Sequence, residues 1–339
     1  MTNENITLHE TYMRRCLELA RLGAGNVAPN PMVGAVIVHN GIIIGEGFHQ
    51  QYGFAHAEVN AVNSVKDKEL LKESEIYVSL EPCAHYGKTP PCADLIVKCG
   101  FKHVYVGCRD SFEKVDGKGI EKIRNAGIPV IVGILEQECI DLNRRFFTWC
   151  TQKRPYVILK WAQTADGFID IERNGSTPTG SVRISNPTTQ YLSHKWRTEE
   201  AAIMVGANTV RNDNPSLNVR FWKGRNPVRI VTDSRNPLST NLKIFDTTSP
   251  TITLDQTQSA SAQAILDTLY NGGLQSVIIE GGAHLHQTFI NANLWDEARI
   301  FTSPTRFGKG LKAAEIQGEL RERMPVGDNV LEVYANAMG

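Results

Sequence analysis

The chain has 339 residues, enough for two domains of ordinary size. Lys+Arg and Asp+Glu number 36 each, so the chain as a whole lacks the basic excess that nucleic-acid-binding proteins carry. No apolar run approaches the roughly 20 residues that cross a bilayer, and the polar start MTNENITLHE does not resemble a signal peptide, so we expect a cytoplasmic protein.

The first half predicts alternating helices and strands. Apolar residues at helical spacing predict a helix over 9–22, and Asn40-Gly41 predicts a tight hairpin turn between strands 33–39 and 42–48. Further helices are expected over 58–65, 93–99, 119–125 and 136–147, and further strands over 76–80, 103–107 and 129–132. Five strands with helices between most of them predict an α/β sandwich of three layers.

A polar stretch over 148–155, which ends in proline, predicts the break between two domains, 1–150 and 151–339. The second domain predicts strands over 156–161, 201–205, 228–232, 276–280, 298–302 and 329–334. Helices are expected over 187–197, 261–270 and 283–291. Both halves are therefore interpreted as α/β domains.

Two short segments of the first half contain the residue types of a catalytic zinc site. His56 and Glu58 start one predicted helix, and Cys92, separated from the Pro82-Cys83 pair by eight residues, starts another. Zinc prefers thiolate and imidazole ligands, and three protein ligands leave the fourth position for water. We expect His56, Cys83 and Cys92 to bind zinc, and the non-ligating Glu58 to move protons from water to a leaving amine. This pattern is typical of the zinc-dependent nucleobase deaminases.

Two other interpretations of these cysteines stay open. All seven cysteines lie in the first 150 residues, and an odd number favours reduced thiols over a disulfide scaffold. A structural zinc would take a fourth ligand from Cys99 or Cys108, but Cys99 lies at the wrong end of its helix and Cys108 follows a strand. Alternatively, no metal binds and the cysteines are ordinary small residues.

The motifs of the first half closely resemble those of the bifunctional deaminase/reductase family of riboflavin biosynthesis. They include Asn30-Pro31, Gly47-Phe48-His49, His56-Ala57-Glu58 and the segment LEPCAHYGKTPPCAD at 80–94. The insertion HYGKTPP between the two cysteines distinguishes this family from the tRNA adenosine and cytidine deaminases. The resemblance implies a cytidine-deaminase-like α/β/α sandwich. It implies a substrate pocket that contains Asn30, His49, His85, Lys88 and Asp110.

The second half resembles the reductase part of the same family, through KWAQTADG at 160–167, the stretch 205–220, VTDS at 231–234 and IEGG at 279–282. The resemblance implies a dihydrofolate-reductase-like α/β domain that uses NADPH. The implied cofactor-binding residues are Ala162, Thr164, Asp166, Arg183, Thr209, Asp213, Ser234, Gly282, Ala283, His284, Leu285 and His286. The implied substrate-binding residues are Ser181, Arg197, Leu217, Arg220 and Glu280, of which the two arginines suit a phosphate.

These observations predict an enzyme with two activities. It would deaminate 2,5-diamino-6-(5-phosphoribosylamino)pyrimidin-4-one with Zn²⁺ and then reduce the ribosyl chain to ribityl with NADPH. Its partner would be this small phosphoribosyl-pyrimidine, not a nucleic acid or a membrane, and we expect a homo-oligomer. One alternative is a nucleic-acid base deaminase with a C-terminal binding domain, and another is a non-catalytic binding protein held together by zinc.

Overall fold

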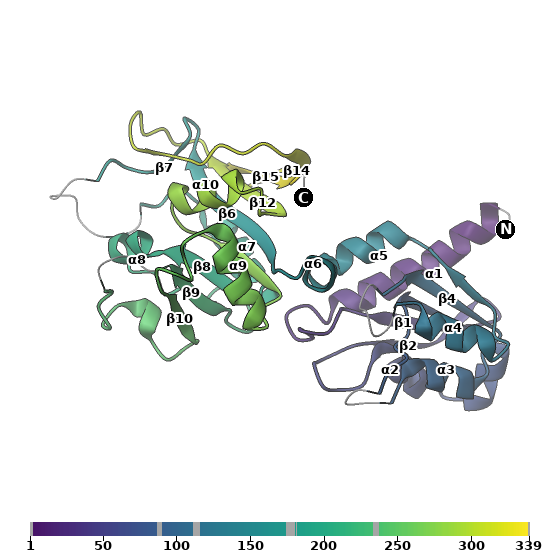
Figure 1. Cartoon of the computed structure of the whole chain (residues 1–339). Coiled ribbons are helices and arrows are strands. Elements are labelled where there is room, and N and C mark those ends of the chain that lie inside the picture. The colour runs from purple at the N-terminus through teal and green to yellow at the C-terminus, as the bar shows by residue number, and fades with distance from the viewer. Residues whose placement is uncertain are drawn as a thin grey trace. The chain divides into compact units, whose positions relative to one another are not determined.

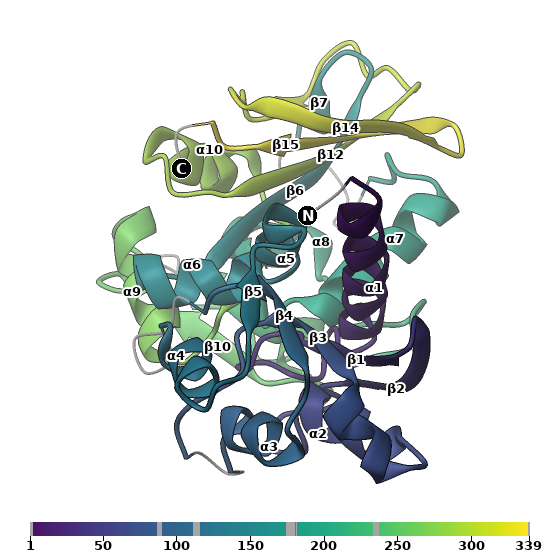
Figure 2. The same cartoon turned by 90° about the vertical axis from the view of Figure 1, so that its right-hand side faces the viewer.

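The computed structural model describes residues 3–86, 90–110, 116–173, 180, 182–232 and 237–337. The chain divides into two compact units, Met1–Lys153 and Arg154–Gly339 (Figures 1 and 2). Each unit has a sheet and hydrophobic clusters of its own. Within the described residues, no helix is long and apolar enough to span a membrane.

The first unit is a five-stranded sheet between two layers of helices. Its elements are α1 (Asn3–Arg21), β1 (Gly34–His39), β2 (Ile42–Phe48), α2 (Ala57–Ser64), η1 (Lys68–Glu73), β3 (Glu75–Leu80), α3 (Cys92–Cys99), β4 (His103–Cys108), α4 (Lys118–Asn125), β5 (Val130–Val132), α5 (Glu136–Leu142) and α6 (Arg144–Gln152). The strand order is β2-β1-β3-β4-β5. Strands β3, β4 and β5 are parallel, so β3 and β4 end at the same edge of the sheet.

Alternation along the strands sends apolar side chains to both faces of this sheet. Ala35 and Ile37 of β1 pack with α2, α3 and α4, whereas Val36 and Val38 pack with α1 and α5. Strand β1 and helix α1 can approach each other closely because residue 34 is glycine. A Cβ on Gly34 would lie 2.0 Å from the carbonyl oxygen of Cys16 in α1. The predicted three-layer α/β/α sandwich is confirmed.

The end of the first unit differs from the sequence prediction. The single helix expected over 136–147 is two helices, which are separated at Asn143. The helix breaks there because the Asn143 side chain bonds the backbone of Met32: its Nδ2 donates to the carbonyl oxygen at 2.9 Å, and its Oδ1 accepts the N–H at 2.8 Å. Helix α6 then continues through 148–152, where we expected a break, because Thr148 and Cys150 are buried. The helix ends at Lys153, which has a left-handed φ of 54°.

The second unit is an eight-stranded sheet in the order β10-β9-β8-β11-β6-β12-β15-β14, with a separate β13-β7 pair. Its elements are β6 (Tyr156–Thr164), β7 (Phe168–Asp170), α7 (Pro187–Glu199), β8 (Ala202–Gly206), α8 (Ala207–Asp213), β9 (Val228–Thr232), η2 (Lys243–Phe245), β10 (Thr251–Leu254), α9 (Ala262–Asn271), β11 (Ser276–Ile279), α10 (Ala283–Asn291), β12 (Glu297–Ser303), β13 (Leu311–Lys312), β14 (Glu319–Val326) and β15 (Asn329–Ala335). The strands from β10 to β12 are parallel, and β15 and β14 run antiparallel.

The two faces of this second sheet bury separate clusters. Helices α9 and α10 pack on one face against residues such as Leu159 and Met204. Trp196 of α7 and Val210 of α8 pack on the other face. Strand β14 was not predicted because its sequence, ELRERMPV, is almost wholly exposed and pairs at the edge of the sheet without an apolar face.

Candidate active sites

The three residues predicted to bind zinc lie together in the first unit. His56 immediately precedes α2, Cys92 is the first residue of α3, and Cys83 lies in the loop after β3. His56 Nδ1 is 3.6 Å from Cys83 Sγ and 3.3 Å from Cys92 Sγ, and the three ligand atoms lie within 4.8 Å of one another. Of the described residues, neither Cys99 nor Cys108 belongs to this group.

This geometry fits a tetrahedral zinc ion. With Zn–S near 2.3 Å and Zn–N near 2.0–2.1 Å, the nitrogen and sulfur ligands of one zinc lie about 3.6 Å apart, close to the two separations of His56 Nδ1. The backbone N–H of Cys92 donates to Cys83 Sγ at 3.3 Å. A hydrogen bond between the two thiols and one from His56 lower the pKa of Cys83, which favours the thiolate that zinc requires.

Glu58 lies in the first turn of α2, two residues beyond His56, with 3% of its surface exposed. Burial, followed by the neighbouring Cys83 thiolate, raises the pKa of Glu58 to about 7. A carboxyl group with this pKa can both accept and return a proton near neutral pH. The arrangement is that of a general acid–base beside a three-ligand metal site.

A cavity of about 440 Å³ opens onto these residues. The predicted substrate residues Asn30, His49, His85 and Asp110 all line it, together with His56, Glu58 and Cys83. Lys88 lies outside the described residues.

His49 is held inside this cavity by two hydrogen bonds. Its Nδ1 lies 3.1 Å from the Ala55 carbonyl oxygen, which can only accept, so the ring proton lies on Nδ1 and Nε2 accepts from Asn30 Nδ2 at 3.1 Å. Burial lowers the pKa of His49, which favours this neutral form.

The sequence analysis missed two features of this pocket. Aromatic side chains form much of its wall, namely Tyr52, Phe54, Phe146 and Trp149, and the last two come from α6, the helix that the sequence did not predict as a separate element. Glu81 also lines it and is 4% exposed; its carboxylate accepts backbone N–H groups from Asp110, Gly117, Gly119 and Ile120 at 3.0–3.3 Å. The Glu-Pro-Cys motif contained this residue, but its partners lie 29–39 residues away.

In the second unit, the predicted residues Thr209, Glu280 and Gly282 lie just beyond the ends of two parallel strands. Strand β8 runs directly into α8, and β11 is followed by Glu280, Gly281 and Gly282 before α10. A Cβ on Gly281 would lie 2.9 Å from Val205 Cα, so only glycine lets these two strand ends approach. Backbone amides at the start of α10 suit a phosphate group of a dinucleotide, which supports the predicted cofactor position at Gly282 and Ala283.

A buried ion pair lies at this edge of the sheet. Arg197 of α7 donates from Nε and Nη2 to the two carboxylate oxygens of Glu280, at 3.0 and 2.6 Å, and Lys160 Nζ lies 3.7 Å from the same carboxylate. Although burial raises the pKa of a carboxyl group, Arg197 and Lys160 lower that of Glu280 to about 2. Arg220 is the exposed cation beside this pair, and its backbone N–H donates to His194 Nδ1 at 2.9 Å.

Other predicted reductase residues are engaged within the protein. Asp166 accepts from Thr164 Oγ1 at 2.6 Å and from the backbone N–H of Gly308 at 2.8 Å, so it fixes a turn. Asp213 pairs with Arg173 at 3.3 Å. The side chains of Leu217, Leu285 and His286 are buried, and those of Thr209 and Ala162 are half-buried. Arg183 and His284 are exposed. Ser181 and Ser234 lie outside the described residues.

Comparison with known proteins gives matches to both units. The family model of the cytidine and deoxycytidylate deaminase zinc-binding region matches residues 6–108, and that of the RibD C-terminal domain matches residues 155–326. The riboflavin biosynthesis protein RibD of Aquifex aeolicus is 37% identical over 330 residues, 91% of this chain and 90% of the relative. The RibD protein of Bacillus amyloliquefaciens is 37% identical over 338 residues, 92% of this chain and 89% of the relative.

Solved structures give the same result. The crystal structure of a diaminohydroxyphosphoribosylaminopyrimidine deaminase/5-amino-6-(5-phosphoribosylamino)uracil reductase from Thermotoga maritima matches with a TM-score of 0.90 and 37% identity, over 98% of this chain and 100% of that chain. The structure of RibD from Acinetobacter baumannii matches with a TM-score of 0.87 and 30% identity, over 97% and 99% of the two chains.

Fold and site together define a zinc-dependent deaminase domain joined to a reductase domain. The chain belongs to the RibD family of riboflavin biosynthesis. It is accordingly a bifunctional enzyme with a deaminase and a reductase, and its cofactors are zinc and NADPH. The predicted fold class and function are confirmed, and the nucleic-acid base deaminase and the non-catalytic zinc protein are set aside.

Proposed function

We propose that residues 1–153 deaminate 2,5-diamino-6-(5-phosphoribosylamino)pyrimidin-4-one, and that residues 154–339 reduce the ribosyl chain of the product to ribityl. The observation that carries this proposal is that His56, Cys83 and the buried Glu58 line one cavity of about 440 Å³, with Cys92 grouped with His56 and Cys83 as the third ligand. A cavity of this size suits a small molecule. The Thermotoga maritima protein, which matches this chain over its whole length, is a deaminase and reductase of these two kinds.

In the deaminase, His56, Cys83 and Cys92 would hold the zinc ion. When bound, zinc supplies the Lewis acidity that makes water a nucleophile at neutral pH. Glu58 accepts the proton that water loses and donates it to the amine that leaves, and burial keeps it out of bulk solvent while it does so. Asn30, His49 and Asp110 orient the pyrimidine ring from the pocket wall.

In the reductase, NADPH supplies the hydride, and the protein binds and orients both reactants. We place the dinucleotide at the ends of β8 and β11, beside Thr209, Gly282 and Ala283, where glycine permits close approach. Leu285 and His286 are weaker candidates, because their backbone N–H groups bond the Gly282 carbonyl oxygen within the first turn of α10.

For the substrate phosphate, the structure favours Arg220 over Arg197. Both donor arms of the Arg197 fork are taken by the Glu280 carboxylate, and an anion beside that carboxylate would be repelled. Arg220 is exposed, and only its Nη1 has a described side-chain bond, to Asn218 Oδ1 at 2.6 Å. We therefore assign the phosphate to Arg220, and to the Arg197–Glu280 pair a role in holding polar groups of the ring or ribose.

Two further expectations concern the whole protein. None of the seven cysteines forms a disulfide, which supports action in the reducing cytoplasm. The expected homo-oligomer stays a prediction, and sedimentation velocity on the purified protein measures it.

The test is incubation of the full-length protein with the diaminopyrimidine, with and without NADPH, followed by mass spectrometry. Without NADPH, we expect one amino group to be replaced by oxygen. With NADPH, we expect the deaminated product to gain two hydrogens. A product that keeps both amino groups, or one that gains no hydrogen when NADPH is present, would contradict the corresponding half of the proposal.

A further inference from the structure

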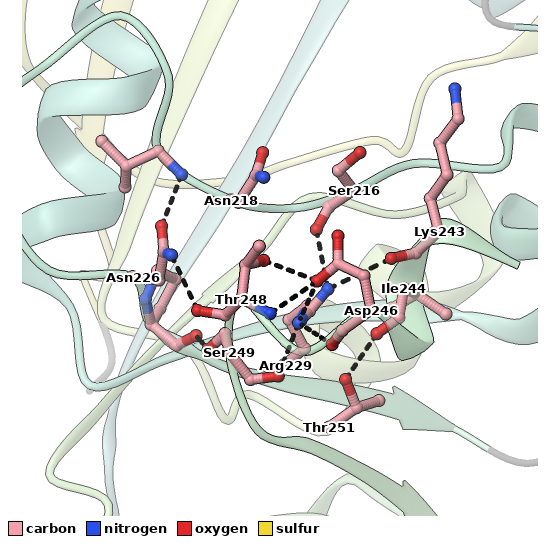
Figure 3. A network of polar contacts seen from close by, with 12 residues as sticks. Ser216, Asn218, Asn226, Arg229, Lys243, Ile244, Asp246, Thr248, Ser249 and Thr251 are labelled. Atoms are coloured by element: carbon pink, nitrogen blue, oxygen red, sulfur yellow. Dashed lines mark hydrogen bonds and ion pairs between the residues drawn. The ribbon is translucent and has the colours of Figure 1, made fainter.

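A completely buried arginine in the second unit is surrounded by backbone carbonyl groups (Figure 3). Arg229 lies on β9 and is 0% exposed. Its guanidinium donates to the carbonyl oxygens of Ser216, Lys243, Asp246 and Ser249, at 3.2, 3.3, 2.9 and 2.5 Å. Asp246 also accepts through its carboxylate, at 2.9 Å, and neutralises the charge. These carbonyls come from two segments of the chain, which Arg229 ties to β9.

Burying a charge is costly, so a buried arginine is tolerated where most of its donors are used. In Arg229 both Nη atoms donate, and only the buried Nε has no hydrogen-bond partner among the described residues. Here the donors reach one carbonyl in the loop that follows α8 and three in the turn 243–249. A lysine in this place has one nitrogen and no planar fork, so it cannot reach both segments with the same geometry. The arrangement requires arginine in particular.

Two asparagines fasten the same loop to the same turn. Asn214 Oδ1 accepts the backbone N–H of Lys243 at 2.8 Å. Asn226 Oδ1 accepts the backbone N–H of Val219 at 2.7 Å, and its Nδ2 donates to the carbonyl oxygen of Thr248 at 3.0 Å (Figure 3). The loop is thus held at its start, its middle and its end.

The loop that is held in this way carries the partners of the two candidate substrate arginines. The carbonyl oxygen of Asn218 accepts from Arg197 Nη1 at 3.1 Å, and its side-chain Oδ1 accepts from Arg220 Nη1 at 2.6 Å. Leu217, between Ser216 and Asn218, has a left-handed φ of 49°, a conformation that persists for leucine only where its surroundings impose it. The position of Ser216 therefore sets the position of Asn218.

We propose that Arg229 is a positioning residue of the reductase: it fixes the loop 214–220 so that Asn218 orients Arg197 and Arg220 toward the substrate. Arg229 itself is buried and contacts no reactant. The inference rests on the proposed function, because it assumes that the substrate binds at Arg197, Glu280 and Arg220. It concerns the pyrimidine substrate and not NADPH, which we place at the ends of β8 and β11.

The experiment compares steady-state kinetics of the full-length Arg229→Lys and Asn226→Ala variants with the wild type. A misplacement of about 1 Å can cost about 100-fold in rate, so we expect kcat/KM for the pyrimidine substrate of the reductase to fall between about 10- and 100-fold in Arg229→Lys. This fall should come from a higher KM for that substrate. The KM for NADPH and the deaminase rate should stay within about twofold of wild type. Asn226→Ala, which removes one tie and leaves the buried charge in place, should show the same pattern more weakly.

Arg154→Lys is the matched control. Arg154 is also a buried arginine of the second unit, with a two-pronged ion pair to Asp296 at 2.6 and 2.7 Å. It should lower the melting temperature without raising the KM for the pyrimidine. If Arg229→Lys and Asn226→Ala lower the melting temperature but leave that KM at the wild-type value, Arg229 has only a structural role and the inference is wrong.

The Arg197→Ala variant separates this inference from the proposed function. If it impairs the reductase while the two loop variants do not, the substrate site stands and only the positioning role fails. If it reduces the substrate with wild-type kinetics, the substrate lies elsewhere and both proposals fail. A rise in the KM for the pyrimidine in all three variants, and not in Arg154→Lys, supports both.

Discussion

Replacing Glu81 by glutamine should loosen one wall of the deaminase pocket. The Glu81 carboxylate accepts two backbone N–H groups at each oxygen: Asp110 and Gly117 at Oε2, and Gly119 and Ile120 at Oε1. It thereby holds Asp110, just after β4, and the amides at the start of α4, where a negative charge is favourable. Glutamine has nearly the same shape but carries an NH₂ group in place of one oxygen.

The magnitude follows from the number of bonds that are lost. Glutamine keeps one acceptor, so two of the four backbone amides face a donor, and a hydrogen bond to a charged group contributes about 1.5–3 kcal/mol. We expect the free energy of local opening to fall by about 3–6 kcal/mol. At 1.4 kcal/mol per decade, this corresponds to about 140- to 20,000-fold faster amide exchange in this segment. Because Asp110 lines the pocket, kcat/KM for deamination should fall as well.

Hydrogen–deuterium exchange of the full-length protein measures this directly, on peptides that cover 116–121. Glu75→Gln is the matched control, since Glu75 starts β3, the strand that Glu81 follows, but is partly exposed and accepts from the Tyr77 hydroxyl, at 3.1 Å, instead of backbone amides. The reductase rate should not change in either variant. Unchanged exchange in Glu81→Gln, or an equal increase in Glu75→Gln, would refute the reasoning.

Three further predictions follow from the two sites. Glu58→Gln should lower the deamination rate by about 100- to 10,000-fold, as expected for a general acid–base, while zinc content and reductase activity are retained; a loss below about tenfold would show that another group moves the proton. Metal analysis should find one zinc per chain in the wild type and little in Cys92→Ser; full zinc occupancy in that variant would remove Cys92 from the ligands. Glu280→Gln should speed amide hydrogen exchange in β11 at neutral pH. The difference in exchange rate from the wild type should shrink as pH falls from about 4.3, the usual glutamate pKa, to about 2, the lowered pKa of Glu280 in the fold. A difference that is constant over this range would mean that the ionised carboxylate does not stabilise the fold.

The sequence predicted those parts of the molecule that depend on local chemistry. Strands β1, β3 and β4 and helices α2 and α3 follow from hydrophobic periodicity and turn residues, because burial on one or both faces leaves a regular pattern. The candidate zinc ligands could be named for a similar reason: each lies at the start of a helix or just after a strand, in a motif of a few residues.

What could not be predicted depends on contacts between distant segments. Helix α6 was missed because the break at Asn143 is created by its bonds to Met32, 111 residues earlier in the chain. The aromatic wall from Phe146 and Trp149 was missed with it. The proposal that Arg220, not Arg197, binds the phosphate likewise depends on a distant contact, because Glu280, which accepts from Arg197, lies 83 residues away in the chain.

Glu81 in the first unit and Arg229 in the second hold loops in the same way, although their charges are opposite. Each is a buried ion whose main partners are the backbone groups of a loop: Glu81 accepts four N–H groups, and Arg229 donates to four carbonyl oxygens. A backbone group satisfied by a buried charge is held more firmly than one that faces water, because the charge would otherwise be left unpaired in a medium of low dielectric constant. Loops beside an active site have little secondary structure of their own, so such an ion gives them a fixed conformation without a helix or a strand. Because backbone groups are common to every residue, no side-chain pattern in the loop reveals the tie, and only the fold shows which ion holds which loop.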